Sequence, residues 1–354
     1  MVVADHRLAS EAGAEILRRG GNAVDAAVAT CLALSVVRPD ASGIGGGGFM
    51  MIHLGEHPTR GPLDTVINYR ETCPGGIGPD TFEMWGDPRA SRFGGRSVAV
   101  PGSIAGLLHA LEQYGTLDRD AVFAPAIRLA ESGFPADGHH VRSARDVLRQ
   151  FESHPGWDER FGFVWSRLMR EGRIEVGDTI RNPEQANALR LIAEHGPRVF
   201  YDGTIADAIV GAVRADGGVL TRQDLAGYRV VETEPIRVLW RDKSLLVMPP
   251  PSSGGIAIAQ TFSLADRLDL ELTKTAWPDA DNAHLLVEIF KHAFADRARH
   301  LADPAFHHVP VAAMLDPEAL DRVADSIDRD RASALNTYGV APPPEDGGTS
   351  HISV

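Results

Sequence analysis

The stretch AVDAAVATCLALSVV, residues 23–37, constrains the fold more than any other part of this 354-residue sequence. Asn22 is placed to cap a helix at its start, and Asp25 lies in the first turn, where the helix dipole favours a carboxylate. Apolar residues occur on nearly every side of this helix, so other elements must surround it. Residues 8–19 have their apolar side chains on one face and end at a Gly-Gly pair, which predicts an amphipathic helix before it.

Composition limits the classes of function. The length allows one large domain or two ordinary ones, and 44% hydrophobic with 23% charged residues is typical of a soluble globular protein. A net charge of −13 disfavours a nucleic-acid partner, because phosphate binding requires a basic patch. The longest apolar run, residues 23–37, is too short and too interrupted to span a bilayer, so we expect no membrane partner.

The two cysteines and the start of the chain carry little further information. Cys31 and Cys73 cannot form a disulfide framework, and neither belongs to a C-x-x-C motif. No basic start followed by an apolar stretch opens the sequence, so we expect no signal peptide in this chain. The site of action in the cell stays open at this level.

The order of predicted elements indicates the fold class. A Gly-rich turn leads into one strand, and a second strand ends near Arg70. Helices are predicted within residues 100–152, at 184–196 and at about 281–301, and RVLWRDKSLLVMPPP predicts two short strands before a proline turn. Helical runs between strand pairs, without regular βαβ alternation, predict an α+β fold. Residues 335–348 have almost nothing to bury and several backbone breakers, which predicts a flexible surface segment.

Gly43, Gly45 and Gly48 match the G-x-G-x-x-G spacing of dinucleotide-binding loops. That motif requires a strand before it and a helix after it, whereas a helix precedes and a strand follows here. We interpret these glycines as positions where backbones approach closely or adopt positive φ.

A polar residue recurs every four positions along the predicted helix 281–301. The set is His284, Glu288, His292, Asp296 and His300. Three such residues could hold a metal on one helix face, but a four-residue period drifts around the helix and H-E-x-x-H is absent. We interpret the set as a solvated polar stripe, and we expect neither a metal nor an organic cofactor.

Arg70 closes the second predicted strand and is followed by Glu71. A guanidinium at a strand end could hold a substrate carboxylate through two parallel hydrogen bonds. The alternative is an ordinary surface salt bridge between the two neighbours.

Thr349 follows Gly347 and Gly348, at the start of an alternating pattern typical of a strand. If the bond before Thr349 is cut, its freed α-amine can serve as the base that activates its hydroxyl. The two glycines make accessible the unusual backbone conformation that attack on the Gly348 carbonyl requires. A Gly-Gly-Thr junction is also compatible with a plain entry into a strand.

Five separated blocks together resemble the γ-glutamyltranspeptidase family, in the same order and with similar spacing. The blocks are LASEAGAEILRRGGNAVDAAVATCLALSVVRPDASGIGGGGFMMIHL, YRETCPGG, SVAVPGSIAGLLHALEQYGTL, VMPPPSSGG and DGGTSHISV. That family belongs to the N-terminal-nucleophile hydrolases, so the resemblance implies an αββα sandwich of two antiparallel sheets between helix layers. It also implies an enzyme whose precursor cuts itself into a large and a small subunit.

The resemblance assigns roles to three residues. It makes Thr349 both the agent of self-cleavage and the catalytic nucleophile, with Gly348 as the residue before the cut. It makes Arg70 the group that binds the α-carboxylate of the γ-glutamyl substrate. The implied reaction transfers the γ-glutamyl group of glutathione, or of another γ-glutamyl amide, to the threonine and then to water or to an amino acid or peptide.

The resemblance also divides the chain. Residues 1–348 would form the large-subunit region of a single catalytic domain, with 335–348 as the segment before the cut. Residues 349–354 would begin the first strand of the small subunit. In this family the small subunit supplies the oxyanion hole, through a Gly-Gly pair, and the groups that bind the substrate amino group.

We therefore expect a truncated or split product that requires a small subunit from the same precursor or from a separate chain. Relatives usually carry an export signal upstream, so the resemblance implies a periplasmic or secreted protein if such a signal is missing from the start of this chain; whether the protein is exported stays open. Two alternatives remain open. One is a glutaryl-type β-lactam acylase or a poly-γ-glutamate-processing relative on the same fold, and the other is an inert large-subunit fragment.

Overall fold

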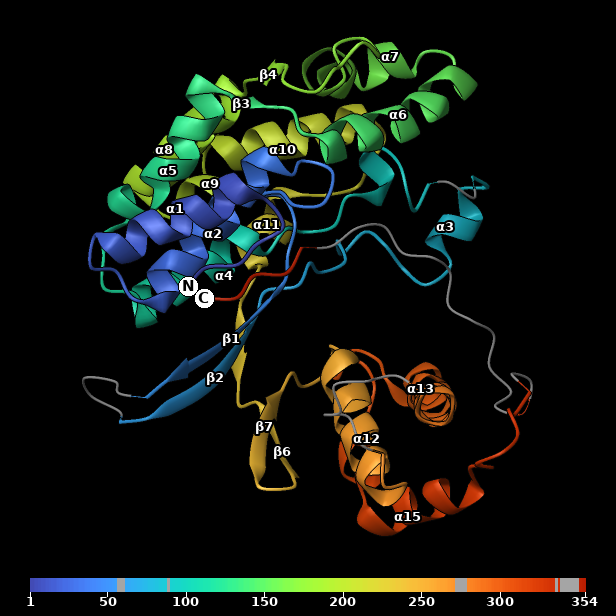
Figure 1. Ribbon diagram of the computed structural model, residues 1–354. Helices are drawn as coiled ribbons and strands as arrows, with labels where there is room; N and C mark the ends of the chain where they lie inside the picture. Colours follow the sequence, from blue (N-terminus) through green and yellow to red (C-terminus); the bar gives the residue numbers. More distant parts are fainter. Residues whose placement is uncertain (56–60, 88–89, 271–278, 335–336, 338–349) are drawn as a thin grey trace. The chain divides into compact units, whose positions relative to one another are not determined.

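The computed structural model describes residues 1–55, 61–87, 90–270, 279–334, 337 and 350–354 (Figure 1). These residues form two compact units. Unit 1 contains Met1–Met50, Ile67–Val231 and, at the end of the chain, residues 350–354. Unit 2 contains the described residues of Met51–Val66 and Glu232–Asp346.

Unit 1 is mainly helical. Its helices are α1 (Arg7–Arg18), α2 (Ala23–Val37), α3 (Thr81–Met84), the short η1 (Gly95–Ser97), α4 (Ser103–Tyr114), α5 (Arg119–Ser132), α6 (Gly138–Ser153), α7 (Trp157–Arg160), the π-helical η2 (Val164–Leu168), α8 (Pro183–His195), α9 (Arg198–Tyr201), α10 (Thr204–Ala215) and α11 (Arg222–Gly227). The helices predicted at 8–19, 23–37 and 184–196, and those within 100–152, are confirmed with shifts of at most a few residues at their ends.

Helix α2 is in contact with α1, α4 and α5 and lies beside α1 in Figure 1. A capping box starts it, in which the side chains of Asn22 and Asp25 each accept a hydrogen bond from the other residue's backbone N–H. Ala26, Val28 and Leu32 are all 0% exposed although they point in different directions around the helix. The predicted burial of this helix on every side is therefore confirmed.

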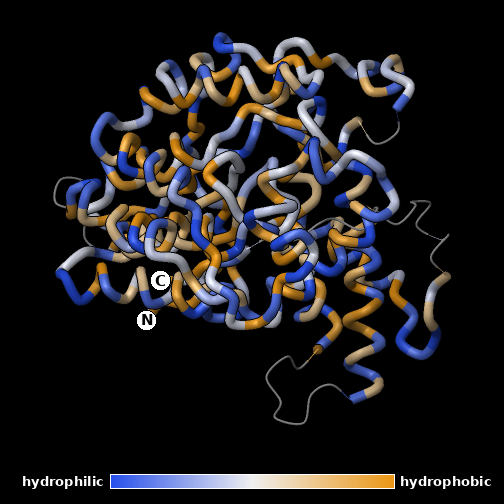
Figure 2. Tube along the Cα trace, turned by 90° about the horizontal axis from the view of Figure 1, so that it is seen from above, coloured by the Kyte–Doolittle hydropathy of each residue, from blue (hydrophilic) through white to orange (hydrophobic). Residues whose placement is uncertain are grey.

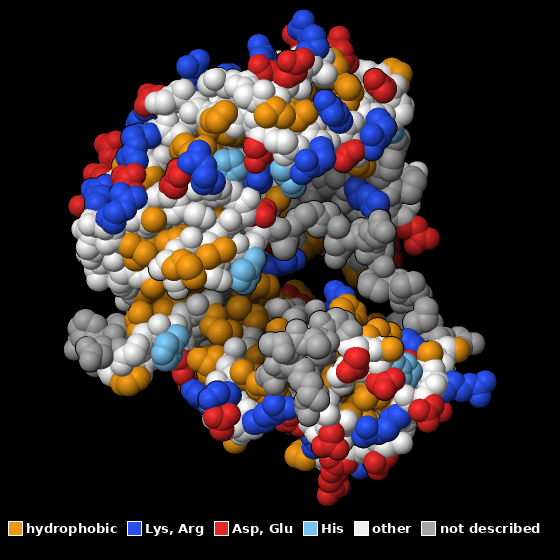
Figure 3. All heavy atoms as spheres, in the orientation of Figure 1, with side chains coloured by type: hydrophobic (Ala, Val, Ile, Leu, Met, Phe, Trp, Pro, Cys, Tyr) orange, Lys and Arg blue, Asp and Glu red, His pale blue; other side chains and the backbone are white. Residues whose placement is uncertain are grey.

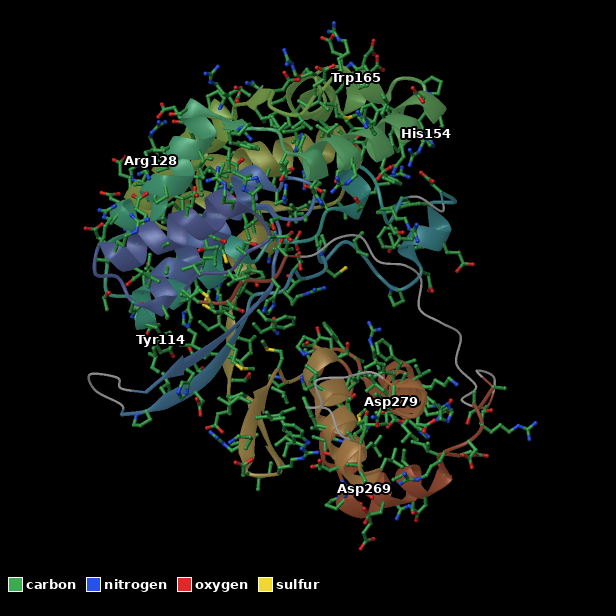
Figure 4. All side chains as sticks on the ribbon, viewed as in Figure 1. Tyr114, Arg128, His154, Trp165, Asp269 and Asp279 are labelled. Atoms are coloured by element: carbon green, nitrogen blue, oxygen red, sulfur yellow. The ribbon has the colours of Figure 1, made fainter. Side chains whose placement is uncertain are left out.

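Asp25 also ties α2 to the connection between α4 and α5. Its carboxylate accepts hydrogen bonds from the backbone N–H groups of Thr116 and Leu117 and from the Thr116 hydroxyl. The Asn22 side chain donates to the carbonyl of Tyr114 at 2.6 Å, at the end of α4 (Figure 4). Polar groups at the start of α2 are thus satisfied by backbone from far along the chain, as buried polar groups require.

The strands form three small sheets. One has the order β1 (Phe49–Leu54), β2 (Leu63–Asn68), β5 (Val231–Thr233), and three of the limits between the two units fall within these strands. The strand pair β3 (Phe134–Pro135) and β4 (Thr179–Ile180) lies in unit 1. In unit 2, β6 (Ile236–Trp240) pairs antiparallel with β7 (Lys243–Val247), which confirms the predicted strand pair before the prolines.

Unit 2 also contains the helices α12 (Gly254–Arg267), α13 (Ala280–His300), α14 (Val311–Met314) and α15 (Pro317–Ser326). Asp279 caps α13 by accepting a hydrogen bond from the Asn282 N–H (Figure 4). One buried cluster joins α12, α13 and α15. Its members are Leu264, Ala265, Leu268, Leu270, Leu285, Ile289, Leu320, Ala324 and Ile327.

Side-chain polarity follows these elements. Hydrophobic and hydrophilic residues alternate along the turns of many helices in Figure 2, as expected of helices with one buried face. Acidic and basic side chains are interspersed over the face that Figure 3 shows. On that face the positive charge on which phosphate binding depends is not gathered into one patch.

Candidate active site

Arg70 follows the end of β2 and presents an open guanidinium. Its side chain is 60% exposed, and Nε lies 3.5 Å from Oε2 of Glu71. The guanidinium carbon is 5.9 Å from the centre of the Phe49 ring, at the start of β1. At 3.5 Å the pairing with Glu71 is loose, so the salt bridge and the carboxylate-binding interpretation are both compatible with this geometry.

The residue before Arg70, Tyr69, is closely packed against glycines. Tyr69 is only 7% exposed. A Cβ atom at Gly47 would lie 2.6 Å from the Tyr69 carbonyl oxygen, and one at Gly102 would lie 2.0 Å from it. At Gly106 it would lie 2.1 Å from the Tyr69 ring. Any side chain at these positions would therefore displace Tyr69 and the arginine that follows it.

The backbone of Arg70 is fixed on both sides. Its N–H donates to Oδ1 of Asn68 at 3.0 Å, and its carbonyl accepts from the Tyr228 hydroxyl at 2.9 Å. Burial, and then the charge of Glu71, raise the pKa of Tyr228, so the phenol stays a proton donor at neutral pH.

Tyr228 is supported in turn by Tyr201. The two rings stack with centroids 5.7 Å apart and an angle of 12° between their planes. The Tyr201 hydroxyl donates to the Pro101 carbonyl at 2.9 Å and accepts from the Ala105 N–H at 3.1 Å. The aromatic pair thus connects the strand end at Arg70 to the start of α4.

The Gly-rich turn before β1 differs in part from our interpretation of it. None of Gly43, Gly45 and Gly48 has positive φ. A Cβ at Gly48 would lie 3.0 Å from the Tyr69 ring, which is a close approach, but one at Gly45 would meet no described atom within 4 Å. The interpretation is right for Gly48 and wrong for Gly43 and Gly45. The tightest position in this turn is Gly47, which lies outside the motif spacing.

The predicted cleavage residues, Gly348 and Thr349, lie outside the described residues, as does nearly all of 335–348. The residues that follow are described. Ser353 and Val3 exchange two backbone hydrogen bonds of 3.0 and 2.8 Å, so the two ends of the chain lie side by side (Figure 1). The Ser350 hydroxyl lies 3.0 Å from the Ser42 hydroxyl and 3.3 Å from Oδ2 of Asp5.

A surface pocket of about 790 Å³ begins two residues after Arg70. It is lined by Thr72, Cys73, Gly75, Gly76, Val100, Thr221, Gln223, Asp224, Gly227, Tyr228 and Arg229. Asp224 is already engaged there, because it accepts hydrogen bonds from the N–H groups of Gly75 and Thr221. Tyr228 is common to this pocket and to the support of Arg70.

The interpretation of the polar stripe on α13 as solvated is wrong at Glu288, whereas His300 at the end of the stripe is exposed. Glu288 is 0% exposed and accepts a 2.6 Å hydrogen bond from Nζ of Lys291. Asp296 accepts from the Gln260 side chain at 2.8 Å, and burial lowers the pKa of His292. Within the described part of the chain, no group of three or more His, Cys, Asp or Glu side chains could hold a metal ion.

A family model described as Gamma-glutamyltranspeptidase matches residues 9–354. The chain belongs to the gamma-glutamyltranspeptidase family. This confirms the resemblance carried by the five sequence blocks.

Three members of the gamma-glutamyltranspeptidase family show how similar this chain is to known proteins. The glutathione hydrolase proenzyme of Escherichia coli K12 is 36% identical over 362 residues, which cover 100% of this chain and 60% of that protein. The Acylase ACY 1 proenzyme of Pseudomonas sp. strain V22 is 36% identical over 366 residues, covering 100% and 62% respectively. The solved structure of gamma-glutamyltranspeptidase from Pseudomonas nitroreducens has a TM-score of 0.84 and 34% identity, and it covers 95% of this chain and 96% of that one.

The structural match confirms the predicted α+β fold of an N-terminal-nucleophile hydrolase. The chain spans 60% to 62% of the length of these two curated relatives. Among the described residues, no helix is both long enough and apolar enough to cross a bilayer. The roles of Arg70, Gly348 and Thr349 stay predictions.

The supports of Arg70 could not be found from sequence motifs. Tyr228 is 158 positions away from Arg70, and no spacing rule connects the two. The glycines at 47, 102 and 106 were visible, but nothing in the sequence showed that all three face Tyr69. The contacts of Ser350 with Ser42 and Asp5 also gave no signal.

Proposed function

We propose that this chain carries the large-subunit part of a γ-glutamyl hydrolase/transferase that acts on glutathione and other γ-glutamyl amides. In this proposal residues 1–348 are the large-subunit region, 335–348 precede the cut and 349–354 begin the small subunit. The observation that carries it is Arg70, which is exposed at a strand end while its backbone is held by Asn68 and Tyr228. The 36% identity to the Escherichia coli glutathione hydrolase proenzyme, across the whole chain, supports the substrate class.

Self-cleavage would prepare the nucleophile. The Thr349 hydroxyl oxygen attacks the Gly348 carbonyl carbon, and the Gly348–Thr349 amide bond breaks as the nitrogen takes a proton and becomes a free amine. Water then hydrolyses the resulting ester, which leaves a carboxylate on Gly348 and a free hydroxyl on Thr349. An α-amine in a model peptide has a pKa of about 8, so a fraction of such amines is unprotonated at neutral pH and can act as the base.

Turnover would use the same hydroxyl twice. With the substrate α-carboxylate held by Arg70, the Thr349 oxygen attacks the γ-carbonyl and passes its proton to the α-amine. The leaving amine, cysteinylglycine in the case of glutathione, takes that proton as its bond to the γ-carbonyl breaks. Water or the amino group of an acceptor then attacks the γ-glutamyl ester and regenerates Thr349.

Two functions in this reaction, stabilising the oxyanion and binding the substrate amino group, would be supplied by the small subunit. A small subunit, cut from the same precursor or encoded separately, would supply the hydrogen-bond donors that stabilise the negative oxygen of each tetrahedral intermediate. Losing one such donor typically lowers the rate by roughly 10²–10³. The same subunit would bind the substrate amino group. The mechanism uses no metal or organic cofactor.

Mass spectrometry and a γ-glutamyl-4-nitroanilide assay of the gene product test this proposal. We expect a new amino terminus at Thr349, and no turnover in Thr349→Ala. Arg70→Met should raise KM by roughly tenfold to a hundredfold, because it removes a hydrogen-bonded charge partner worth about 1.5–3 kcal/mol. Arg149→Met, which changes an exposed arginine on α6, is the matched control and should leave KM unchanged.

Two results would contradict the proposal. One is activity that survives Thr349→Ala. The other is a single uncut chain without turnover in the presence of its small subunit, which would favour an inert large-subunit fragment.

A glutaryl-type acylase is the second candidate, because the Acylase ACY 1 proenzyme is as similar to this chain as the glutathione hydrolase proenzyme is. Glutaryl and γ-glutamyl groups both end in a carboxylate that an arginine could bind, and they differ in the α-amino group. Comparing kcat/KM for a γ-glutamyl anilide and the matching glutaryl anilide separates the two. A higher value for the glutaryl compound would favour the acylase, or a poly-γ-glutamate-processing relative if neither is cleaved but the polymer is.

A further inference from the structure

We propose that Asp5 and Ser42 are positioning residues, which hold Ser350 and thereby set the position of the neighbouring Thr349. This inference rests on the proposed function, since it concerns the residue next to the proposed nucleophile. It adds two residues from the beginning of the chain to the machinery of self-cleavage and turnover. We call the three hydrogen-bonded side chains of Asp5, Ser42 and Ser350 the serine clamp.

The serine clamp has a defined direction. The Ser42 hydroxyl donates to the Ser350 oxygen at 3.0 Å, and the Ser350 hydroxyl donates to Oδ2 of Asp5 at 3.3 Å. Each hydroxyl therefore uses its single proton within the chain of bonds, and the carboxylate at the end accepts. Hydrogen bonds in such a series polarise and strengthen one another.

Arg38 forms hydrogen bonds with the backbones of both Asp5 and Ser42. Its backbone carbonyl, just beyond the end of α2, accepts the Ser42 N–H at 2.8 Å. Its guanidinium donates to the Asp5 carbonyl at 3.1 Å. One residue thus fixes the backbone of both Asp5 and Ser42, and their side chains converge on Ser350.

Arg38 is itself immobilised. It is only 6% exposed and donates to both carboxylate oxygens of Asp137, at 3.0 and 2.8 Å. Asp137 in turn caps α6 by accepting from the His140 N–H at 2.9 Å. A planar guanidinium bound to both oxygens of one carboxylate is a geometrically specific pair. The serine clamp is therefore anchored to two helices, α2 and α6.

A second attachment lies three residues further along. Ser353 and Val3 exchange backbone hydrogen bonds of 3.0 and 2.8 Å. A slip of one residue would break these two bonds, and it would move Ser350 away from Ser42 by about the 3.8 Å that separates consecutive Cα atoms. The two attachments together fix both the register and the direction of the segment that begins at Ser350.

Such fixation matters for a nucleophile one residue away. Consecutive Cα atoms are separated by about 3.8 Å, so a displacement of Ser350 is passed on to its neighbour almost undiminished. A misplacement of about 1 Å can lower a catalytic rate by roughly a hundredfold. Positioning groups of this kind act on kcat and on self-cleavage, and they leave substrate affinity unchanged.

The test compares Ser42→Ala, Asp5→Asn and Ser350→Ala with wild type in the gene product. We expect each to slow self-cleavage and to lower kcat for γ-glutamyl-4-nitroanilide by roughly tenfold to a hundredfold, with KM unchanged. Ser350→Thr keeps the hydroxyl and should recover most of the lost rate. Ser97→Ala, which removes a hydroxyl bonded to the Gly94 carbonyl in the same unit, is the matched control and should behave as wild type.

The outcomes separate this inference from the proposed function. If wild type is never cut at Thr349, the proposed function fails and this inference fails with it. If wild type is cut and active while the three variants keep wild-type rates, the serine clamp has no positioning role and the proposed function stands. A loss of kcat that Ser350→Thr does not recover, accompanied by a lower thermal midpoint, would show a structural role only and would overturn the inference.

Discussion

Helix α2 of unit 1 and helix α13 of unit 2 both contribute to a buried core, yet they are buried in different ways. Around α2 the side chains are buried on all sides, as Ala26, Val28 and Leu32 show. On α13 the residues Val287, Phe290 and Phe294 remain 51%, 42% and 49% exposed. The packing of α2 is complete within the described chain, whereas one face of α13 leaves large apolar side chains in contact with solvent.

The buried carboxylates of the two helices also have different hydrogen-bond partners. Asp25 on α2 and Glu288 on α13 are both 0% exposed. Neutral donors satisfy Asp25, mainly the backbone N–H groups of Thr116 and Leu117. A cation satisfies Glu288, namely Lys291 one turn further along the same helix. The difference shows that burial of an acid is tolerated either by an ordered loop or by a local ion pair.

The largest effect we expect is from Lys291→Met, which leaves Glu288 buried without its cation. Breaking a buried pair in this way costs roughly 3–5 kcal/mol of unfolding free energy. The double variant Glu288→Gln/Lys291→Met removes both charges and should recover a substantial part of the loss. Urea unfolding at pH 7, followed by circular dichroism, measures all three proteins. A double variant no more stable than the single one would contradict the ion-pair account.

The same pair predicts a pH dependence. Burial acts to raise the pKa of Glu288, but the hydrogen bonds from Lys291 and Ser333 outweigh it, and the pKa is lowered. A lowered folded-state pKa means that the pair contributes stability above the unfolded value of about 4.3, and that this is lost as pH falls through the folded value. The deficit of Lys291→Met should therefore be greatest near neutral pH and shrink in acid.

A pair of truncations on α2 and α13 tests the packing difference directly. Leu32→Ala on α2 should cost roughly 3 kcal/mol of unfolding free energy, because it opens a cavity in a filled core. Phe290→Ala on α13 removes a larger side chain but should cost only about 1 kcal/mol, because much of its surface is already in water. Thermal and urea unfolding of both variants measure this order. Equal costs would mean that the exposed face of α13 is covered in solution.

How far the sequence predicts this molecule differs between the same two helices. The position and burial of α2 followed from local signals, namely the capping pair Asn22 and Asp25 and an apolar pattern on every side. The polar period on α13 predicted a solvated stripe and was wrong at Glu288. Its burial depends on Lys291 and on the backbone of Ser333, which lies 45 positions away. A four-residue spacing alone cannot distinguish a solvated acid from one that is paired and buried.

The candidate site shows the same limit. Arg70 could be singled out from its place after a strand, and family resemblance gave it a role. Its supports could not, because Tyr228 and Gly102 reach it only through the folded chain. Ser350 and Ser42 are 308 positions apart, so their contact depends on the two ends of the chain meeting. Signals within one element were readable, and contacts between distant elements were not.

The smallest effects we expect come from one arginine in each unit that pairs with a carboxylate on a neighbouring helix. Arg128 on α5 pairs with Glu15 on α1 (Figure 4), and its side chain is 55% exposed. Arg267 on α12 pairs with Asp321 on α15 but is only 25% exposed, and it also donates to the Pro317 carbonyl at 3.1 Å.

Because exposed ion pairs contribute little, Arg128→Met should change the unfolding free energy by less than about 0.5 kcal/mol. Arg267→Met should cost about 1 kcal/mol, since it also leaves a backbone carbonyl without its partner. Urea unfolding in low salt and in 1 M NaCl separates the charge contribution from the hydrogen-bond contribution. In 1 M NaCl the Debye screening length is about 3 Å, so exposed ion pairs contribute almost nothing there. Salt should abolish the small effect of Arg128→Met and leave most of that of Arg267→Met, because the carbonyl hydrogen bond is not an exposed charge pair. Equal salt sensitivity would show that Arg267 acts through its charge alone, and that α12 and α15 are held together by their apolar cluster.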